Sequence, residues 1–172
     1  EVRGAILADP EAHVALQVFE WSGQAHRHVI QDWRMVRSAS DLARISAVLR
    51  THRRQLRDGP TGLGAALDFA RLQLDRAPDC GLRKIDVSGD GRSNDGIPPQ
   101  LLHYQQDFGD ITVNGLAILS DVADLEFYYR RFVIRGPSAF ADFTDFPAAM
   151  KRKLIKELGV PRLGLLVAPR TR

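Results

Sequence analysis

The sequence predicts a doubly wound α/β fold, in which a mostly parallel sheet carries helices on both faces. Segments with strand patterning and segments with helical patterning alternate from residue 38 onward, which is the order that produces parallel strands joined by helices. A composition of 44% hydrophobic and 26% charged residues is ordinary for a folded protein and argues against disorder or a disulfide scaffold. A length of 172 residues suits one domain with a buried core.

The chain is expected to open with the end of a helix and a β-hairpin. Apolar residues within 1–8 have helical spacing and stop at Asp9-Pro10, which predicts the last turns of a helix. Apolar residues alternate from His13 to the turn at Trp21–Gly23, and they alternate again from Val29 to Met35. Two alternating runs joined by a short turn predict antiparallel strands.

Two helices separated by a glycine-containing loop are expected next. Ser40 and Asp41 predict the start of the first helix, whose apolar face is Leu42, Ile45, Leu49 and Leu56. Its polar face carries Arg44, Arg50, Arg53, Arg54 and Arg57. The loop 58–62, Asp-Gly-Pro-Thr-Gly, ends this helix, and the spacing of four apolar residues predicts the second: Leu63, Leu67, Ala70 and Leu74.

The second half of the chain is expected to alternate strands and helices. A strand from Lys84 to Val87 leads into a loop at 88–96 that is rich in glycine and aspartate. The elements expected after it are a helix at 99–108, a strand at 111–119, a helix at 124–132 and a helix at 146–158.

The basic character of the chain is concentrated at its C-terminal end. The net charge is +3, and residues 150–172 contain seven Lys and Arg side chains against one Glu. We interpret this stretch as a solvated helix face followed by a basic tail at 159–172, and we expect no nucleic-acid partner. No apolar run approaches the ~20 residues that span a bilayer, so no integral membrane segment is expected.

The 88–96 loop contains the highest density of side chains that can bind a ligand or a metal ion. It holds hard oxygen donors of the kind that Mg²⁺ prefers: Ser88, Asp90, Ser93, Asn94 and Asp95. In a doubly wound sheet, ligands bind at the carboxyl ends of the strands, where this loop is expected to lie together with loop 58–62. The alternative interpretation is that Gly-Asp-Gly and Asn-Asp-Gly only form turns.

Other residues capable of chemistry have ordinary interpretations. His26 and His28 share one strand face, which we interpret as a polar edge rather than a metal pair. The single Cys80 follows Asp79 rather than a cation, which gives no reason to expect an activated thiolate. Helical spacing makes core packing the interpretation for three aromatic residues: Tyr128, Tyr129 and Phe132.

Several segments together resemble a von Willebrand factor A domain: GPTGLGAALDFA from Gly59, KIDVSGDGRSNDG from Lys84 and ITVNGLAIL from Ile111. With VFEWSG from Val18 and YYRRFVIRGPSAF from Tyr128, the resemblance is to an uncharacterised bacterial family of such domains. It covers residues 1–158. It implies a sheet with one antiparallel edge strand and a strand order of 3-2-1-4-5-6.

The resemblance also implies a metal-ion-dependent adhesion site made of three loops. The first loop has an Asp-x-Ser-x-Ser motif, the second a Thr and the third an Asp. Thr61 and Asp90 match the second and third, and the resemblance implies that the Thr hydroxyl contacts the metal while the Asp acts through water. The implied function is non-enzymatic binding of a protein whose carboxylate completes the shell of Mg²⁺, Mn²⁺ or Ca²⁺, in a periplasmic or secreted location.

The first motif does not occur in the sequence. The resemblance places it on a central strand before residue 1, so we expect the domain to be incomplete at its N-terminus, poorly stable alone and weak or inactive in metal binding. Asp86-Val-Ser-Gly-Asp90 has a related spacing but follows the Thr61 loop instead of preceding it. We therefore interpret Asp86 as a strand carboxylate that needs a hydrogen-bond partner.

An enzyme is the alternative function. The SGDGRSND loop from Ser88 also resembles the Mg²⁺-binding loop of haloacid-dehalogenase-type phosphohydrolases. Those enzymes use an aspartate nucleophile in an Asp-x-Asp motif near the chain start, which this sequence does not contain, and the spacing from Asp90 to Asp95 is one residue too long.

Overall fold

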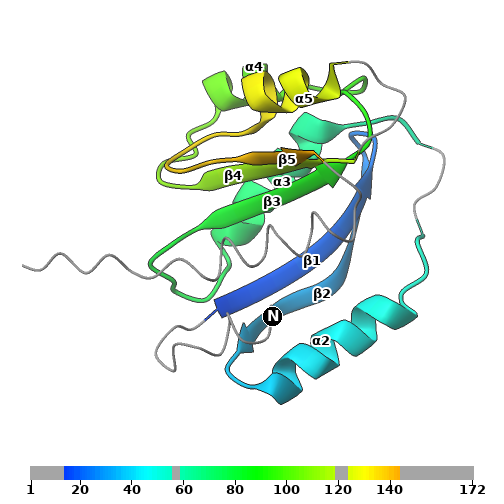
Figure 1. Ribbon diagram of the computed structural model, residues 1–172, viewed down its shortest axis with the longest axis vertical. Coiled ribbons are helices and arrows are strands. Elements are labelled where there is room, and N and C mark those ends of the chain that lie inside the picture. The colour runs from blue at the N-terminus through cyan, green and yellow to red at the C-terminus, as the bar shows by residue number, and fades with distance from the viewer. Residues whose placement is uncertain (1–13, 56–58, 119–123, 144–172) are drawn as a thin grey trace, which may run out of the picture.

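A computed structural model of the chain describes residues 14–55, 59–118 and 124–143 (Figure 1). These residues form a mixed α/β structure with four α-helices and two small sheets, one antiparallel and one parallel. The mixed α/β class is therefore confirmed. A single doubly wound sheet is not what the described strands form, because β1 (Val14–Ser22) and β3 (Lys84–Gly89) belong to different sheets.

The antiparallel sheet is the predicted hairpin. β1 pairs with β2 (His26–Val36) from Val14 opposite Val36 to Ser22 opposite His26, with irregular register between Leu16 and Phe19. The turn is made by Gly23, whose φ of +59° is a conformation that favours glycine.

Helix α2 (Ala39–Thr51) follows the hairpin and packs on β2. Its N-cap is Ser38, whose hydroxyl accepts a hydrogen bond from the Asp41 backbone N–H at 3.2 Å, so the prediction of a cap at Ser40 was two residues late. Ile45 is buried with Val36, whereas Leu49 is exposed, so the apolar face is shorter than predicted. Leu56 and Arg57 lie outside the described residues.

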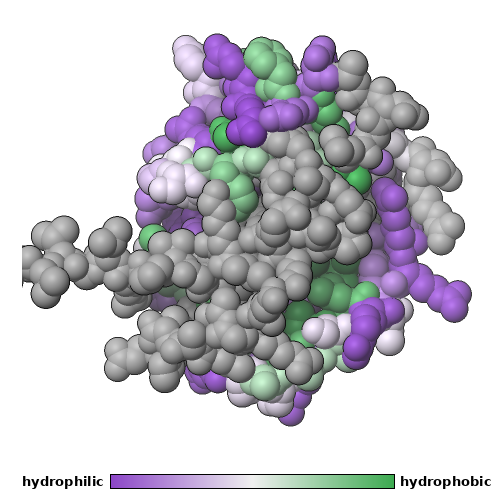
Figure 2. Space-filling view, viewed as in Figure 1, coloured by the Kyte–Doolittle hydropathy of each residue, from purple (hydrophilic) through white to green (hydrophobic). Residues whose placement is uncertain are grey.

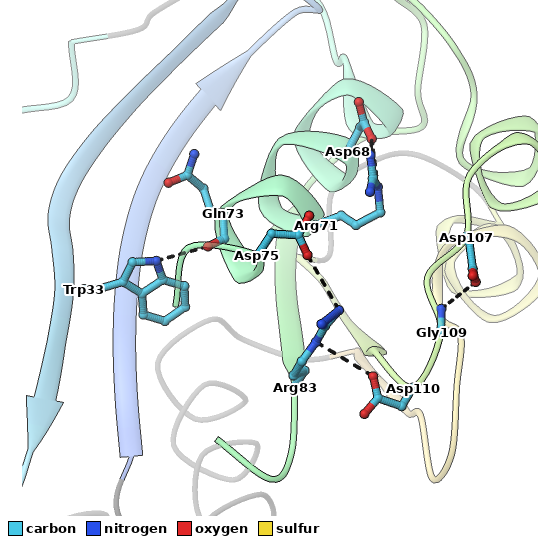
Figure 3. Close-up of polar contacts among 9 residues, drawn as sticks. All are labelled: Trp33, Asp68, Arg71, Gln73, Asp75, Arg83, Asp107, Gly109 and Asp110. Carbon is cyan, nitrogen blue, oxygen red and sulfur yellow. Dashed lines mark hydrogen bonds and ion pairs between the residues drawn. The ribbon is translucent and has the colours of Figure 1, made fainter. Parts of the chain in front are cut away.

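Helix α3 (Leu63–Leu74) joins the two sheets. The Phe69 ring meets Phe19 of β1 edge-on at 4.9 Å between centroids, and the Gln73 carbonyl accepts a hydrogen bond of 3.2 Å from Trp33 Nε1 of β2 (Figure 3). On its other side, Leu63 and Leu67 share a buried core with β3. Because α3 contacts both sheets, it holds their strands in one structural unit.

The parallel sheet has the order β3-β4-β5, with β4 (Thr112–Ala117) between β3 and β5 (Ala141–Phe143). Every residue of β4 is buried. Ile85, Val87 and Val113 of this sheet belong to the same core as residues of α3, of α4 (Pro99–Gln105) and of the segment formed by α5 (Leu125–Tyr128) and the π-helix η1 (Tyr129–Val133).

The end of α3 opposite the loops lies near the start of the parallel sheet. Arg83, directly before β3, has Nη2 4.0 Å from the Asp75 carboxylate at the C-cap of α3 and Nε 3.7 Å from the Asp110 carboxylate before β4 (Figure 3). These ion pairs are long and partly exposed, so they orient the segments more than they stabilise them.

Several predicted elements differ from the observed ones. The predicted helix at 99–108 ends at Gln105, the predicted strand at 111–119 is limited to β4, and the predicted helix at 124–132 is divided into α5 and η1. The three residues of β5 were not predicted, since so short a strand leaves no periodicity. The predicted helices at 1–8 and 146–158 and the tail at 159–172 lie outside the described residues.

Hydrophilic residues dominate the outer rim of the surface shown in Figure 2, with apolar ones among them near α4 and α5, where Leu101 and Phe127 are exposed. Among the helices that the structure describes, none combines the length and the apolar character needed to cross a membrane.

Candidate functional site

Two loops meet at the end of the molecule where β1 and β3 finish. One is the segment 59–62 before α3, and the other is the segment 90–96 after β3. The Thr61 backbone N–H donates to Asn94 Oδ1 at 2.7 Å, and the Asn94 backbone N–H donates to the Thr61 carbonyl at 2.9 Å. This reciprocal pair fixes the two loops against each other although their residues are far apart in the sequence.

Ser93 ties the second loop to the start of α3. Its hydroxyl donates to the Thr61 carbonyl at 3.2 Å and accepts a hydrogen bond from the Leu63 backbone N–H at 3.3 Å. The N-cap residue of α3 is Gly62, which has no side chain to accept a hydrogen bond from that helix end, so Ser93 supplies one from another part of the chain.

The hairpin turn is the third segment at the site. The Asp95 carboxylate accepts hydrogen bonds from the Gln24 backbone N–H at 2.7 Å and from Gln24 Nε2 at 3.2 Å. The Gly23 backbone N–H donates to the Pro60 carbonyl at 2.6 Å. Because three segments are bound to one another through short polar contacts, this end of the fold has a defined geometry.

The structure brings the predicted residues Thr61 and Asp90 into neighbouring positions. A Cβ atom placed on Gly91, the residue after Asp90, would lie 3.3 Å from Thr61 Oγ1, so the Thr61 hydroxyl lies against the backbone next to Asp90. Asp90 is exposed and Thr61 is half-buried. One hydroxyl and one carboxylate, both hard oxygen donors, are thus carried by adjacent loops.

The other predicted donors have structural roles. Ser88 belongs to β3 rather than to the loop, and Ser93, Asn94 and Asp95 hold the loops together through the contacts above. Within the described part of the chain, no group of three or more His, Cys, Asp or Glu side chains is arranged to hold a metal ion. Thr61 and Asp90 are thus the two predicted donors in these loops whose side chains take no part in the contacts between loops described above.

Asp86 has the hydrogen-bond partner that the sequence required. Asn114 Nδ2 of β4 donates to Asp86 Oδ1 at 3.1 Å, and Asn114 Oδ1 accepts a hydrogen bond from the Phe140 backbone N–H at 3.2 Å. The interpretation of Asp86 as a strand carboxylate is confirmed.

Two tyrosines beside the site are functional candidates that the sequence analysis missed. Tyr128 and Tyr129 pack in the core as predicted, but the Tyr128 hydroxyl also accepts a hydrogen bond from the Ser93 backbone N–H at 3.3 Å. The Arg92 guanidinium lies 5.7 Å from the Tyr128 ring centroid and 3.8 Å from the Asp124 carboxylate. The sequence contained a signal for this role, because a tyrosine at a position that is expected to be buried carries a hydroxyl that requires a hydrogen-bond partner.

The pKa of the Tyr129 hydroxyl is affected by Asp90 of the candidate site. Burial raises the pKa of the Tyr129 hydroxyl far above its ordinary value, and the neighbouring Tyr128 and the Asp90 carboxylate raise this pKa further. The Tyr129 hydroxyl therefore stays protonated at any physiological pH.

The remaining candidates lie elsewhere. The His28 ring stacks on His52 with 5.7 Å between centroids, and His52 Nε2 is 3.2 Å from a Glu20 carboxylate oxygen. His26 is exposed on β2, and Cys80 is a half-buried free thiol. None of these residues contributes to the loops at the Thr61 site as the structure describes them.

Comparison with known protein families gives a match over residues 1–161 to the family described as "Protein of unknown function (DUF1194)". A search of curated proteins returns no match to the chain.

Proposed function

Since the chain belongs to the DUF1194 family, a family of unknown function, we propose its function from the geometry of the site. The proposal is a non-enzymatic protein-binding domain of the von Willebrand A type. It binds a divalent cation beside Thr61 and Asp90, and a carboxylate of the partner protein completes the coordination of that cation.

The observation that carries the proposal is the position of Thr61. The reciprocal hydrogen bonds with Asn94 set the Thr61 backbone, and its hydroxyl then lies against Gly91 next to Asp90. A neutral hydroxyl and one carboxylate leave a bound divalent cation with net positive charge. Such a site favours an anionic ligand, and a carboxylate on the surface of a protein partner is of that kind.

The arrangement of strands supports the von Willebrand A assignment. The sheets have the orders β2-β1 and β3-β4-β5, and α3 contacts both β1 and β3. Within the part of the chain that the structure describes, β1 pairs with β2 alone and β3 with β4 alone. We propose that one further strand lies between β1 and β3, which produces the order 3-2-1-4-5-6 with the hairpin's outer strand as the antiparallel edge.

A bound cation would supply the positive charge that attracts the partner's carboxylate. The chain's own part is to present the donors. Thr61 would offer a hydroxyl oxygen from a loop that the hydrogen bonds with Asn94 hold in place, and Asp90 would offer a carboxylate. These two donors would bind Mg²⁺ only weakly by themselves.

The phosphohydrolase alternative has less support from the geometry. In such an enzyme the 88–96 loop would supply oxygen ligands to Mg²⁺, but the side chains of Ser93 and Asn94 are bound to the Thr61 loop and that of Asp95 to Gln24. Turnover of a phosphate ester that disappears in Asp90→Ala would nevertheless favour the enzyme over the binding domain.

The test measures the melting temperature of the full-length gene product with and without Mg²⁺ or Mn²⁺. We expect either cation to raise the melting temperature clearly. Asp90→Ala should abolish the shift, whereas Asp79→Ala, which removes an exposed carboxylate before β3, should leave it intact. A full-length protein whose melting temperature does not respond to either cation would contradict the proposal.

A further inference from the structure

Tyr129 carries a buried hydroxyl that the described residues do not pair. The residue is 0% exposed, and its hydroxyl oxygen has no hydrogen-bond partner within the described part of the chain. Leaving a buried hydroxyl unpaired is energetically unfavourable. A phenylalanine would fill the same space without that cost, so packing explains the ring and leaves the hydroxyl unexplained.

The ring is held in one position by two glycines. It lies across the parallel sheet, where a Cβ on Gly115 of β4 would be 2.6 Å from Tyr129 Cδ1 and a Cβ on Gly89 of β3 would be 2.7 Å from the Tyr129 hydroxyl. Real Cβ atoms do not approach other atoms so closely. Tyr129 therefore occupies a slot made by the absence of side chains on two adjacent strands, and its hydroxyl reaches the last residue of β3.

The hydroxyl reaches the point where the chain leaves the sheet toward the candidate cation site. Gly89 directly precedes Asp90, and the same Cβ position on Gly89 is 3.8 Å from Trp21 Cζ2 at the end of β1. The Tyr129 hydroxyl and the Trp21 ring thus both lie close to Gly89, the residue before Asp90.

The local backbone presents Tyr129 in an unusual way. Tyr129 is the first residue of the π-helix η1, directly after α5. Short π-helical turns change the direction of side chains relative to a regular helix and are frequent at functional sites. The neighbouring Tyr128 hydroxyl has a partner in the Ser93 backbone N–H of the loop, whereas the Tyr129 hydroxyl lies at the end of the strand before that loop without a partner among the described residues.

We propose that the Tyr129 hydroxyl hydrogen-bonds to an oxygen ligand of the divalent cation bound beside Asp90 and so acts as a positioning residue of that site. The inference rests on the proposed function. Groups that hydrogen-bond to the ligands of a metal orient those ligands, and their removal typically costs about 10–100-fold in metal affinity. The binding of the cation would at the same time satisfy the buried hydroxyl.

The test compares Tyr129→Phe with Tyr104→Phe in the full-length gene product, with Mn²⁺ as the probe. Tyr129→Phe removes only the oxygen in question, and Tyr104→Phe removes a hydroxyl that is exposed to solvent. We expect Tyr129→Phe to weaken Mn²⁺ binding about 10-fold, measured by titration calorimetry or Mn²⁺ electron paramagnetic resonance, and Tyr104→Phe to leave it unchanged.

A second measurement separates positioning from a purely structural role. In EDTA, Tyr129→Phe should melt at the same temperature as the wild type or higher, because no native hydrogen bond is lost. A lower melting temperature in EDTA with unchanged Mn²⁺ affinity would show that the hydroxyl has a structural partner, and unchanged values of both would show that it has no role. Either result overturns the inference while wild type and Asp90→Ala still differ in Mn²⁺ affinity; loss of that difference contradicts the proposed function itself.

Discussion

Single residues determine how closely the segments of this fold approach one another. Tyr129, Gly89 and Gly115 form the clearest case, since the tyrosine ring fits on the sheet only where two strands lack side chains. Periodicity alone predicts that Tyr129 is buried. It does not reveal which glycines receive the ring, because Gly89 and Gly115 are neighbours only through the pairing of β3 with β4.

The two glycines allow a prediction in which each serves as the control for the other. A methyl group at either position overpacks the core, so Gly89→Ala and Gly115→Ala should each lower the free energy of unfolding by about 1–3 kcal/mol in urea denaturation. Tyr129→Phe should restore much of the loss in Gly89→Ala, where the clash is with the hydroxyl, and little in Gly115→Ala, where it is with the ring. Equal rescue of both variants would mean that the ring does not lie as described.

At the scale of elements, the sequence predicts the longer helices and strands well. The hairpin, α3 and β3 have clear periodicity and turn residues at their ends, and the structure confirms them. The segment after β4 was predicted less well because its helix changes to π geometry at Tyr129. The residues of η1 contact β4 and α4, and a local pattern does not encode such contacts.

One of those contacts leads to a prediction about pH. His103 of α4 is partly buried, and its Nε2 lies 3.1 Å from the Val133 carbonyl of η1, while its Nδ1 is buried without a partner among the described residues. Burial lowers the pKa of His103 below its ordinary value of 6.5, and the Arg135 charge lowers it further, although the hydrogen bond to Val133 opposes this. His103 is therefore harder to protonate in the folded protein than in the unfolded chain.

The stability linked to His103 is fully present above pH 6.5 and is lost as the pH falls from 6.5 toward the lowered pKa. We expect His103→Gln, which keeps a donor for the Val133 carbonyl, to flatten the dependence of the unfolding free energy on pH in this window. His26→Gln, a change in an exposed side chain, should leave the slope as in the wild type. Urea denaturation at several pH values measures both, and an unchanged slope in His103→Gln would contradict the prediction.

At the scale of the whole molecule, helix α3 connects the two sheets. Phe19 and Trp21 of β1 pack against the core that contains Val87 of β3. Strand edges without a neighbour expose backbone groups that can pair with other chains and cause aggregation. The proposed strand between β1 and β3 would cover both edges at once.

The proposed strand predicts that the facing edges of β1 and β3 are hydrogen-bonded in the full-length gene product. In EDTA, the backbone N–H groups of these two edges should therefore exchange slowly with solvent deuterium. The same protection should persist in Asp90→Ala, since it arises from strand pairing and not from the cation. Rapid exchange at both edges would remove the support for a strand in that position.

The sequence by itself determined the mixed α/β class, the hairpin, the principal helix and the two loops that contain Thr61 and Asp90, because periodicity and turn residues act over a few neighbouring positions. Only the tertiary structure decided how those loops dock through Ser93 and Asn94, which partner Asp86 has, and where the Tyr129 hydroxyl lies. The physical reason is that these contacts join residues about 30 positions apart or more. Their geometry depends on how strands and helices pack, which local patterns do not contain.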